Sequence, residues 1–157
     1  MDETYIRIKG ENAYLYRAVD SCGNTIDFLV SENRDKQAAK KFFRKALKAP
    51  HNSQPRVTTT DKYPATEIAI LEETYYGDLN SRTQHRMTKY LNNIIEQDHR
   101  FIKKKINPML GFGSIETAEK TLSGIEAMHM VHKGQVKGIR SVLDEVRVIN
   151  ELLGIAA

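Results

Sequence analysis

The sequence predicts an α/β fold in which a mixed sheet is flanked by helices, with an extra helix near the C-terminal end. Three early segments, residues 4–9, 13–19 and 25–30, alternate in character as strands do, with Gly10 and the turn sequence DSCGN between them. Helical and short β-branched segments then follow one another along the chain. The length of 157 residues is typical of one domain with one hydrophobic core.

The first half of the chain supplies most of the expected sheet. The three early segments are predicted to form antiparallel strands. Residues 35–48 have alanine, phenylalanine and leucine at helical spacing, with lysine and arginine covering the remainder, which predicts a helix packed on the sheet. The run RVTTT then predicts a buried strand that ends at Asp61. A helix over residues 64–74 should follow, with Pro64 in its first turn.

The second half is predicted to be mainly helical. The sequence SRTQHRMTKY is expected to hold one more short strand, and residues 90–105, YLNNIIEQDHRFIKKK, have the apolar spacing of a helix. Ser114 is placed to cap a helix over residues 115–132. Residues 138–154 have an apolar stripe typical of an amphipathic helix, which would pack on this chain or on a second copy.

Composition and charge exclude several classes of protein. Cys22 is the only cysteine, which excludes an internal disulfide and any cysteine-based zinc cluster and suits a reducing cytoplasm. No window approaches the roughly 20 apolar residues of a membrane span, and the start MDETYIRIKG has no export leader. A net charge of +4 is compatible with a polyanionic partner. We therefore expect a cytoplasmic protein without a membrane segment.

Polar residues interrupt the apolar pattern of residues 90–105 on one side. At 100° per residue, Asn92, Glu96, His99 and Lys103 fall within a strip about 60° wide beside the apolar face. Such a strip either is an ordinary polar flank, with Glu96 paired to Arg100, or lines a cleft.

Three acidic residues stand where a sheet and a helix would present them together. Asp2 starts the first strand, Asp61 ends the RVTTT strand, and Glu96 lies on the polar strip. Each has an ordinary explanation as a terminal, turn or surface residue. If they converge, however, their carboxylates are able to hold two divalent cations about 4 Å apart, as phosphodiester chemistry requires. Mg²⁺ fits an all-oxygen ligand set, with Mn²⁺ as the alternative.

Two basic runs are candidate contacts for a nucleic acid. Arg100, Lys103, Lys104 and Lys105 lie beside the proposed carboxylate site, so we predict that they contact phosphate groups. The lysines and arginine of residues 35–48 are interpreted instead as a solvated helix face.

Five segments also resemble, in order, the catalytic region of insertion-sequence family 6 transposases, and the resemblance covers residues 2 to about 135. The segments are DETYIRIKG, YLYRAVDSCGNTIDFLVSENRDKQAAKKFF, TTDKYP, HRMTKYLNNIIEQDHRFIKKK and MLGFGSIETAEKTLSGIEAMHMVHKGQ. These transposases are DDE enzymes with a ribonuclease-H-like fold. The resemblance implies that Asp2, Asp61 and Glu96 are the catalytic, metal-binding triad, with 34 intervening residues, 62–95, between the last two. Lys103 matches a basic residue near the DNA end, and Asn92, Asn93 and His99 are implied to make supporting contacts.

The activity implied is metal-dependent cleavage at insertion-sequence ends, followed by attack of the freed 3′-hydroxyl on target DNA. Residues 1–134 would form the catalytic domain and residues 135–157 a C-terminal amphipathic helix. The family acts on DNA as dimers or larger assemblies. Relatives carry a helix-turn-helix before this region, whereas this chain begins one residue before Asp2, so we expect a truncated chain or a start upstream. Two alternatives stay open: an inactive remnant that binds DNA or a full-length partner, and a general nuclease or resolvase of the same fold.

Overall fold

An antiparallel sheet forms the centre of the computed structural model, which describes the whole chain except residues 50–52, 62, 89–92, 140, 153 and 155–157. Its strands are β1 (Asp2–Ile8), β2 (Glu11–Val19) and β3 (Thr25–Ser31), in the spatial order β1-β2-β3. Gly10, at φ +83°, makes the tight turn between β1 and β2 without steric cost. The three strands predicted from alternation are thereby confirmed.

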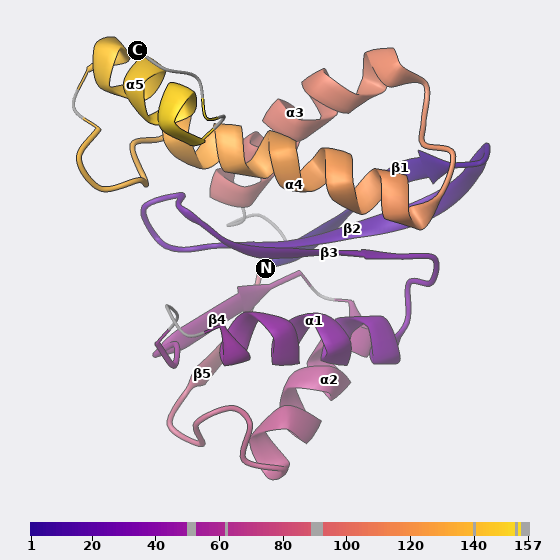
Figure 1. The fold of residues 1–157 in the computed structure, drawn as a ribbon. Helices are drawn as coiled ribbons and strands as arrows, with labels where there is room; N and C mark the ends of the chain where they lie inside the picture. Colours follow the sequence, from indigo (N-terminus) through magenta and orange to yellow (C-terminus); the bar gives the residue numbers. More distant parts are fainter. Residues whose placement is uncertain (50–52, 62, 89–92, 140, 153, 155–157) are drawn as a thin grey trace.

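Helices cover both faces of this sheet (Figure 1). On one face lie α1 (Lys36–Lys48) and α2 (Pro64–Tyr75); on the other lie α3 (Asn93–Ile106) and α4 (Ile115–His132). Alternate residues of β2 point into the two resulting cores: Ala13 and Leu15 pack toward α3 and α4, whereas Tyr16 packs toward α1. Each core is therefore the contact of one sheet face with one helical layer.

The remaining strands form a separate pair rather than joining one mixed sheet. β4 (Val57–Thr60) and β5 (Gln84–Met87) are parallel, and α2 lies in the crossover between them. The backbone link recorded between this pair and the start of β1 is a single hydrogen bond, from the Met1 amine to the Thr59 carbonyl at 2.8 Å. The expected single mixed sheet is thus two sheets here, because no ladder of backbone hydrogen bonds joins β1 to β4 among the described residues.

The predicted limits of α1, α2 and α4 agree with the structure to within one residue, because the residues that begin these helices have local effects, whereas the helix predicted over residues 138–154 begins only at Val142. Pro64 occupies the first turn of α2. The Ser114 side chain accepts the Thr117 N–H at the start of α4, and the Thr117 side chain accepts the Ser114 N–H, which completes a capping box. The short 3₁₀ helix η1 (Asn107–Met109) joins α3 to the following loop, and α5 (Val142–Leu152) follows α4. Among the described helices, none has the length and apolar content to cross a bilayer.

Candidate metal and nucleic-acid site

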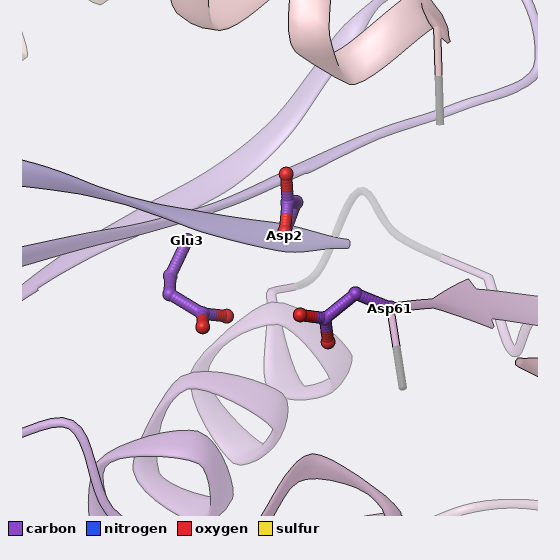
Figure 2. Close-up of side chains that lie close together, drawn as sticks. All are labelled: Asp2, Glu3 and Asp61. Carbon is purple, nitrogen blue, oxygen red and sulfur yellow. The ribbon is translucent and has the colours of Figure 1, made fainter. Parts of the chain in front are cut away.

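Three carboxylates gather where the start of β1 meets the end of β4 (Figure 2). Asp2, Glu3 and Asp61 each offer a carboxylate oxygen, and these oxygens all lie within 4.8 Å of one another. Asp61 follows β4 directly, and one of its oxygens accepts the Tyr63 N–H at 3.1 Å. The structure therefore brings together two of the three predicted acids and adds Glu3, which had not been predicted.

The environment of Asp2 favours the protonated form of its carboxyl. Burial, together with the smaller effects of the neighbouring Glu3 and Asp61 carboxylates, raises its pKa to about 6. Burial likewise raises the pKa of Glu3, against the opposing effect of Arg34. A site with this excess of negative charge and oxygen donors is suited to a hard divalent cation, which would replace the missing positive charge.

Arg34 partly balances this site from one side. Its Nε donates to Glu3 Oε1 at 2.6 Å, and its guanidinium lies 3.9 Å from an oxygen of Asp61. The guanidinium also stacks over the Tyr63 ring at 4.0 Å, and the Tyr63 hydroxyl donates to the Arg34 carbonyl at 2.9 Å. Glu3 is consequently held by an arginine, whereas the Asp2 side chain forms no ion pair within the part of the chain that the structure describes and remains available to a ligand.

Glu96 lies in the first turn of α3 with an exposed side chain. It does not belong to the carboxylate group formed by Asp2, Glu3 and Asp61 within the described part of the chain. Alternation along β1 nevertheless puts Asp2 on the same strand face as Ile6 and Ile8, which pack against α3. Asp2 and α3 are therefore on one side of the sheet. The Glu96–Arg100 pair, one of the two alternatives for the polar strip, is absent from the ion pairs of the described residues.

A buried ionic network fixes the position of α3. Arg17, fully buried on β2, donates to Asp98 of α3 at 2.5 Å and to both oxygens of Glu126 of α4 at 2.6 and 2.9 Å. Asp98 also binds His129 at 2.7 Å and Lys133 at 3.0 Å. Although burial acts to raise the pKa of Asp98, these cationic and hydrogen-bonding neighbours lower it below its usual range. The helix α3, which carries Glu96, is thus held to the sheet through Asp98, two residues after Glu96.

The residues predicted to contact DNA are placed in different environments. Arg100, Lys104 and Lys105 are exposed on α3, whereas Lys103 is half-buried and lines a groove with Tyr5 and Arg7. His99 is only 6% exposed, and burial lowers its pKa to about 3, so its ring is neutral and packed inside the protein. Any effect of His99 on DNA is therefore indirect. Asn92 lies outside the described residues, and Asn93 begins α3 with an exposed side chain.

The basic residues of α1 are mostly neutralised within the protein. Lys36 and Lys40 pair with Glu72 of α2 at 3.0 and 2.7 Å. Arg44 pairs with Glu73 at 3.0 Å, and Lys45 pairs with Asp27 of β3 at 2.8 Å. This face of α1 is therefore partly an ion-paired contact with its neighbours, where the sequence had indicated a solvated surface.

Sequence reasoning missed Glu3 and the buried network for identifiable reasons. A residue next to Asp2 on a strand should point to the opposite face, so Glu3 was not considered a partner. At the start of β1, however, Asp61 approaches closely enough for all three carboxylates to meet (Figure 2). Arg17 lies on the same face of β2 as the buried Ala13 and Leu15, because side chains alternate along a strand. This alternation in the sequence could have predicted that Arg17 is a buried charge.

Comparisons with known proteins identify the family of this chain. A family model described as a DDE domain matches residues 1–135. The transposase for insertion sequence-like element IS431mec of Staphylococcus aureus strain N315 is 40% identical over 133 residues, which cover 85% of this chain and 57% of that protein. The transposase for insertion sequence element IS257 in transposon Tn4003 of S. aureus gives the same values. An uncharacterized protein, pYV0051, of Yersinia pseudotuberculosis serotype I is 41% identical over 71 residues, covering 45% of this chain and 66% of that protein.

Strand-borne carboxylates in an α/β domain, together with the match over most of the chain, define the class as a DDE domain. The chain belongs to the DDE transposases of insertion-sequence family 6. It spans a little over half the length of the staphylococcal transposases that it matches.

Proposed function

We propose that this chain is the catalytic domain of a DNA transposase that cleaves and joins phosphodiester bonds at insertion-sequence ends. The observation that carries the proposal is the meeting of Asp2 and Asp61, from β1 and β4, in one carboxylate group. We assign the catalytic domain to residues 1–134 and a separate amphipathic helix to residues 135–157. The hydrogen bond from Met1 to Thr59 supports a ribonuclease-H-like arrangement, in which β1 and β4 are neighbours.

The metal ligands in this proposal are Asp2, Asp61 and Glu96. The donor set fits Mg²⁺, or Mn²⁺ as the alternative, because carboxylate oxygens converge, and because burial and the adjacent carboxylates of Glu3 and Asp61 raise the pKa of Asp2. A pair of such ions, when bound, supplies charge stabilisation at the attacking and leaving oxygens. We infer that Glu96 completes the set from α3, which lies on the same side of the sheet as Asp2.

The protein residues have separate tasks around that group. Arg34 holds Glu3 by a charge-assisted hydrogen bond and so leaves Asp2 and Asp61 to bind cations. The Tyr63 N–H fixes the orientation of the Asp61 carboxylate. Arg100, Lys103, Lys104 and Lys105 are proposed to contact DNA phosphates from α3. The reaction is assigned to the cytoplasm, where DNA and Mg²⁺ are both present.

The test uses Asp61→Asn with pre-cut element ends, target DNA and Mg²⁺. The unaltered chain is expected to give strand-transfer product, and Asp61→Asn is expected to reduce that product by at least about 100-fold, because one ligand of the reacting metal site is lost. Glu119→Gln removes an exposed carboxylate on α4 and serves as the matched control. A chain that binds Mg²⁺ by calorimetry yet gives no product, with or without the substitution, would favour the inactive remnant.

Substrates with matched and scrambled end sequences separate transposition from general nuclease activity. Strand transfer restricted to matched ends supports the transposase, whereas equal cutting of both supports the nuclease or resolvase alternative. The family membership of the chain favours the first outcome.

We further propose that the working form contains more than one copy of the chain. Support comes from α5, where Val142 and Leu143 are 73% and 81% exposed. An apolar stripe left open in this way is suited to packing against a second copy.

A further inference from the structure

A groove along β4 and β5 is lined by basic and amide side chains, and no part of the proposed function uses it. It measures about 660 Å³, and its described lining contains no acidic residue. Its basic and amide lining consists of Gln54, Arg56, Asn80, Arg82, Gln84 and Arg86. A groove with cationic donors and no carboxylate is suited to an anionic ligand.

The three arginines of this groove differ from most other described arginines in having no carboxylate partner. Arg17, Arg34, Arg44 and Arg147 each form an ion pair with a carboxylate. No ion pair involves the groove arginines among the described residues. One guanidinium hydrogen bond is present there, from Arg86 to the side-chain oxygen of Gln84 at 3.5 Å. All three are exposed, so their guanidinium groups are available for bidentate contacts.

Hydrogen bonds fix the two sides of the groove to each other. Arg56 accepts the Gln84 N–H through its carbonyl at 2.9 Å, and the Thr83 hydroxyl donates to the Pro55 carbonyl at 2.7 Å. Gln54 donates to the Asp78 carbonyl at 3.0 Å and accepts the Asn80 N–H at 3.2 Å. The segment before β4 is therefore joined to the segment before β5, which preorganises the lining for a ligand.

The groove continues toward the carboxylate site. An adjoining groove of about 580 Å³ shares Pro55, Arg56, Val57 and Arg86 with the first. It is also lined by Met1, which precedes Asp2, by Thr59, two residues before Asp61, and by Ile94 and Ile95, which precede Glu96. A polyanion bound along the arginines would thus reach the side chains that the proposed function assigns to catalysis.

We propose that Arg56, Arg82 and Arg86 bind the sugar-phosphate backbone of DNA and direct a strand toward Asp2 and Asp61. The role of the groove during strand transfer rests on the proposed function. DNA binding by the groove does not, because it requires neither metal nor catalysis.

The test measures binding of a labelled DNA duplex by fluorescence anisotropy in EDTA over a range of NaCl concentrations. The triple variant Arg56→Gln, Arg82→Gln, Arg86→Gln is compared with Lys41→Gln, Lys120→Gln, Lys137→Gln, which removes the same charge from exposed positions elsewhere. The arginine variant should weaken binding by about 10-fold or more near 0.1 M salt, and its salt slope should fall by about 2 to 3. The lysine control should change affinity by less than about 3-fold.

An unchanged salt slope in the arginine variant would overturn the proposal. An equal loss of DNA affinity in the lysine control would also overturn it, because it would indicate an effect of net charge alone. Circular dichroism checks that each variant is folded. If the triple variant does not fold, the three single arginine variants replace it, and each is expected to lower the salt slope by about 1. The binding assay contains EDTA and requires no reaction, whereas strand transfer requires Mg²⁺ and the carboxylate site. Loss of strand transfer with normal DNA binding would therefore contradict the proposed function alone, whereas unchanged DNA binding by the arginine variant would contradict the role of the groove alone.

Discussion

Burial shifts the pKa of Asp2 on β1 upward and the pKa of His99 on α3 downward. Asp2 has a pKa raised from 3.8 to about 6, so the folded state binds its proton more tightly than the unfolded state. The stability this residue contributes is therefore lost as pH rises between those values. His99 has a pKa lowered from 6.5 to about 3, mainly by burial and secondarily by Arg17 and Lys103. The stability that neutral His99 contributes is lost as pH falls from about 6.5 to about 3.

Replacing His99 should flatten the loss of stability in acid. In His99→Phe, the drop in thermal midpoint between pH 6.5 and pH 4.5 should be at least about 5 °C smaller than in the unaltered chain, because no buried imidazole must then be protonated on unfolding. His132→Phe removes an exposed histidine of α4 and should leave the drop unchanged. Thermal unfolding followed by circular dichroism measures both, and parallel curves for His99→Phe and the unaltered chain would contradict the assigned burial effect.

Most secondary-structure elements of this chain follow from local sequence, whereas their mutual positions depend on the Arg17 network. Alternation in β1, β2 and β3, the proline of α2 and the serine cap of α4 each act within a few residues. Arg17 instead joins residues 81 and 109 positions away, on α3 and α4. No local pattern identifies such partners, because the pairing forms only when both helices pack on the same sheet face.

Breaking the network at Arg17 should destabilise the fold strongly. Arg17→Met leaves Asp98 and Glu126 buried with reduced compensation, and we expect a cost of about 3 to 5 kcal/mol in the free energy of unfolding. Arg147→Met removes an exposed pair with Asp144 on α5 and should cost less than about 1 kcal/mol. Urea denaturation followed by fluorescence or circular dichroism compares them, and equal small losses would show that the buried pairs contribute little to stability.

On the scale of the whole molecule, the open apolar stripe of α5 contrasts with the two filled cores on either side of the sheet. Ile6, Leu15 and Ile102 lie in one core and Phe42 and Ile70 in the other, each less than 9% exposed. Val142, Leu143 and Val146 of α5 remain largely exposed. The interior is therefore complete without α5, which supports assembly through this helix.

A substitution on α5 should change assembly without changing the fold. Leu143→Asp is expected to shift the sedimentation coefficient from an associated form to a monomer at micromolar concentration, while the thermal midpoint extrapolated to low concentration stays the same. Lys137→Asp alters charge at an exposed position just before α5 and serves as control. A monomeric unaltered chain at the same concentration would rule out self-association through α5 under these conditions.

The sequence by itself determined the order of strands and helices, the caps and turns that limit them, and the family resemblance that the comparisons confirmed. These features depend on periodicity and on residues close together in the chain. Only the tertiary structure decided that Glu3 joins Asp2 and Asp61, that His99 is buried, and that Arg56, Arg82 and Arg86 share one groove. Each of these features depends on how segments far apart in sequence pack together. Burial and the proximity of other charged groups then determine the protonation of each side chain and whether it is free to bind a ligand.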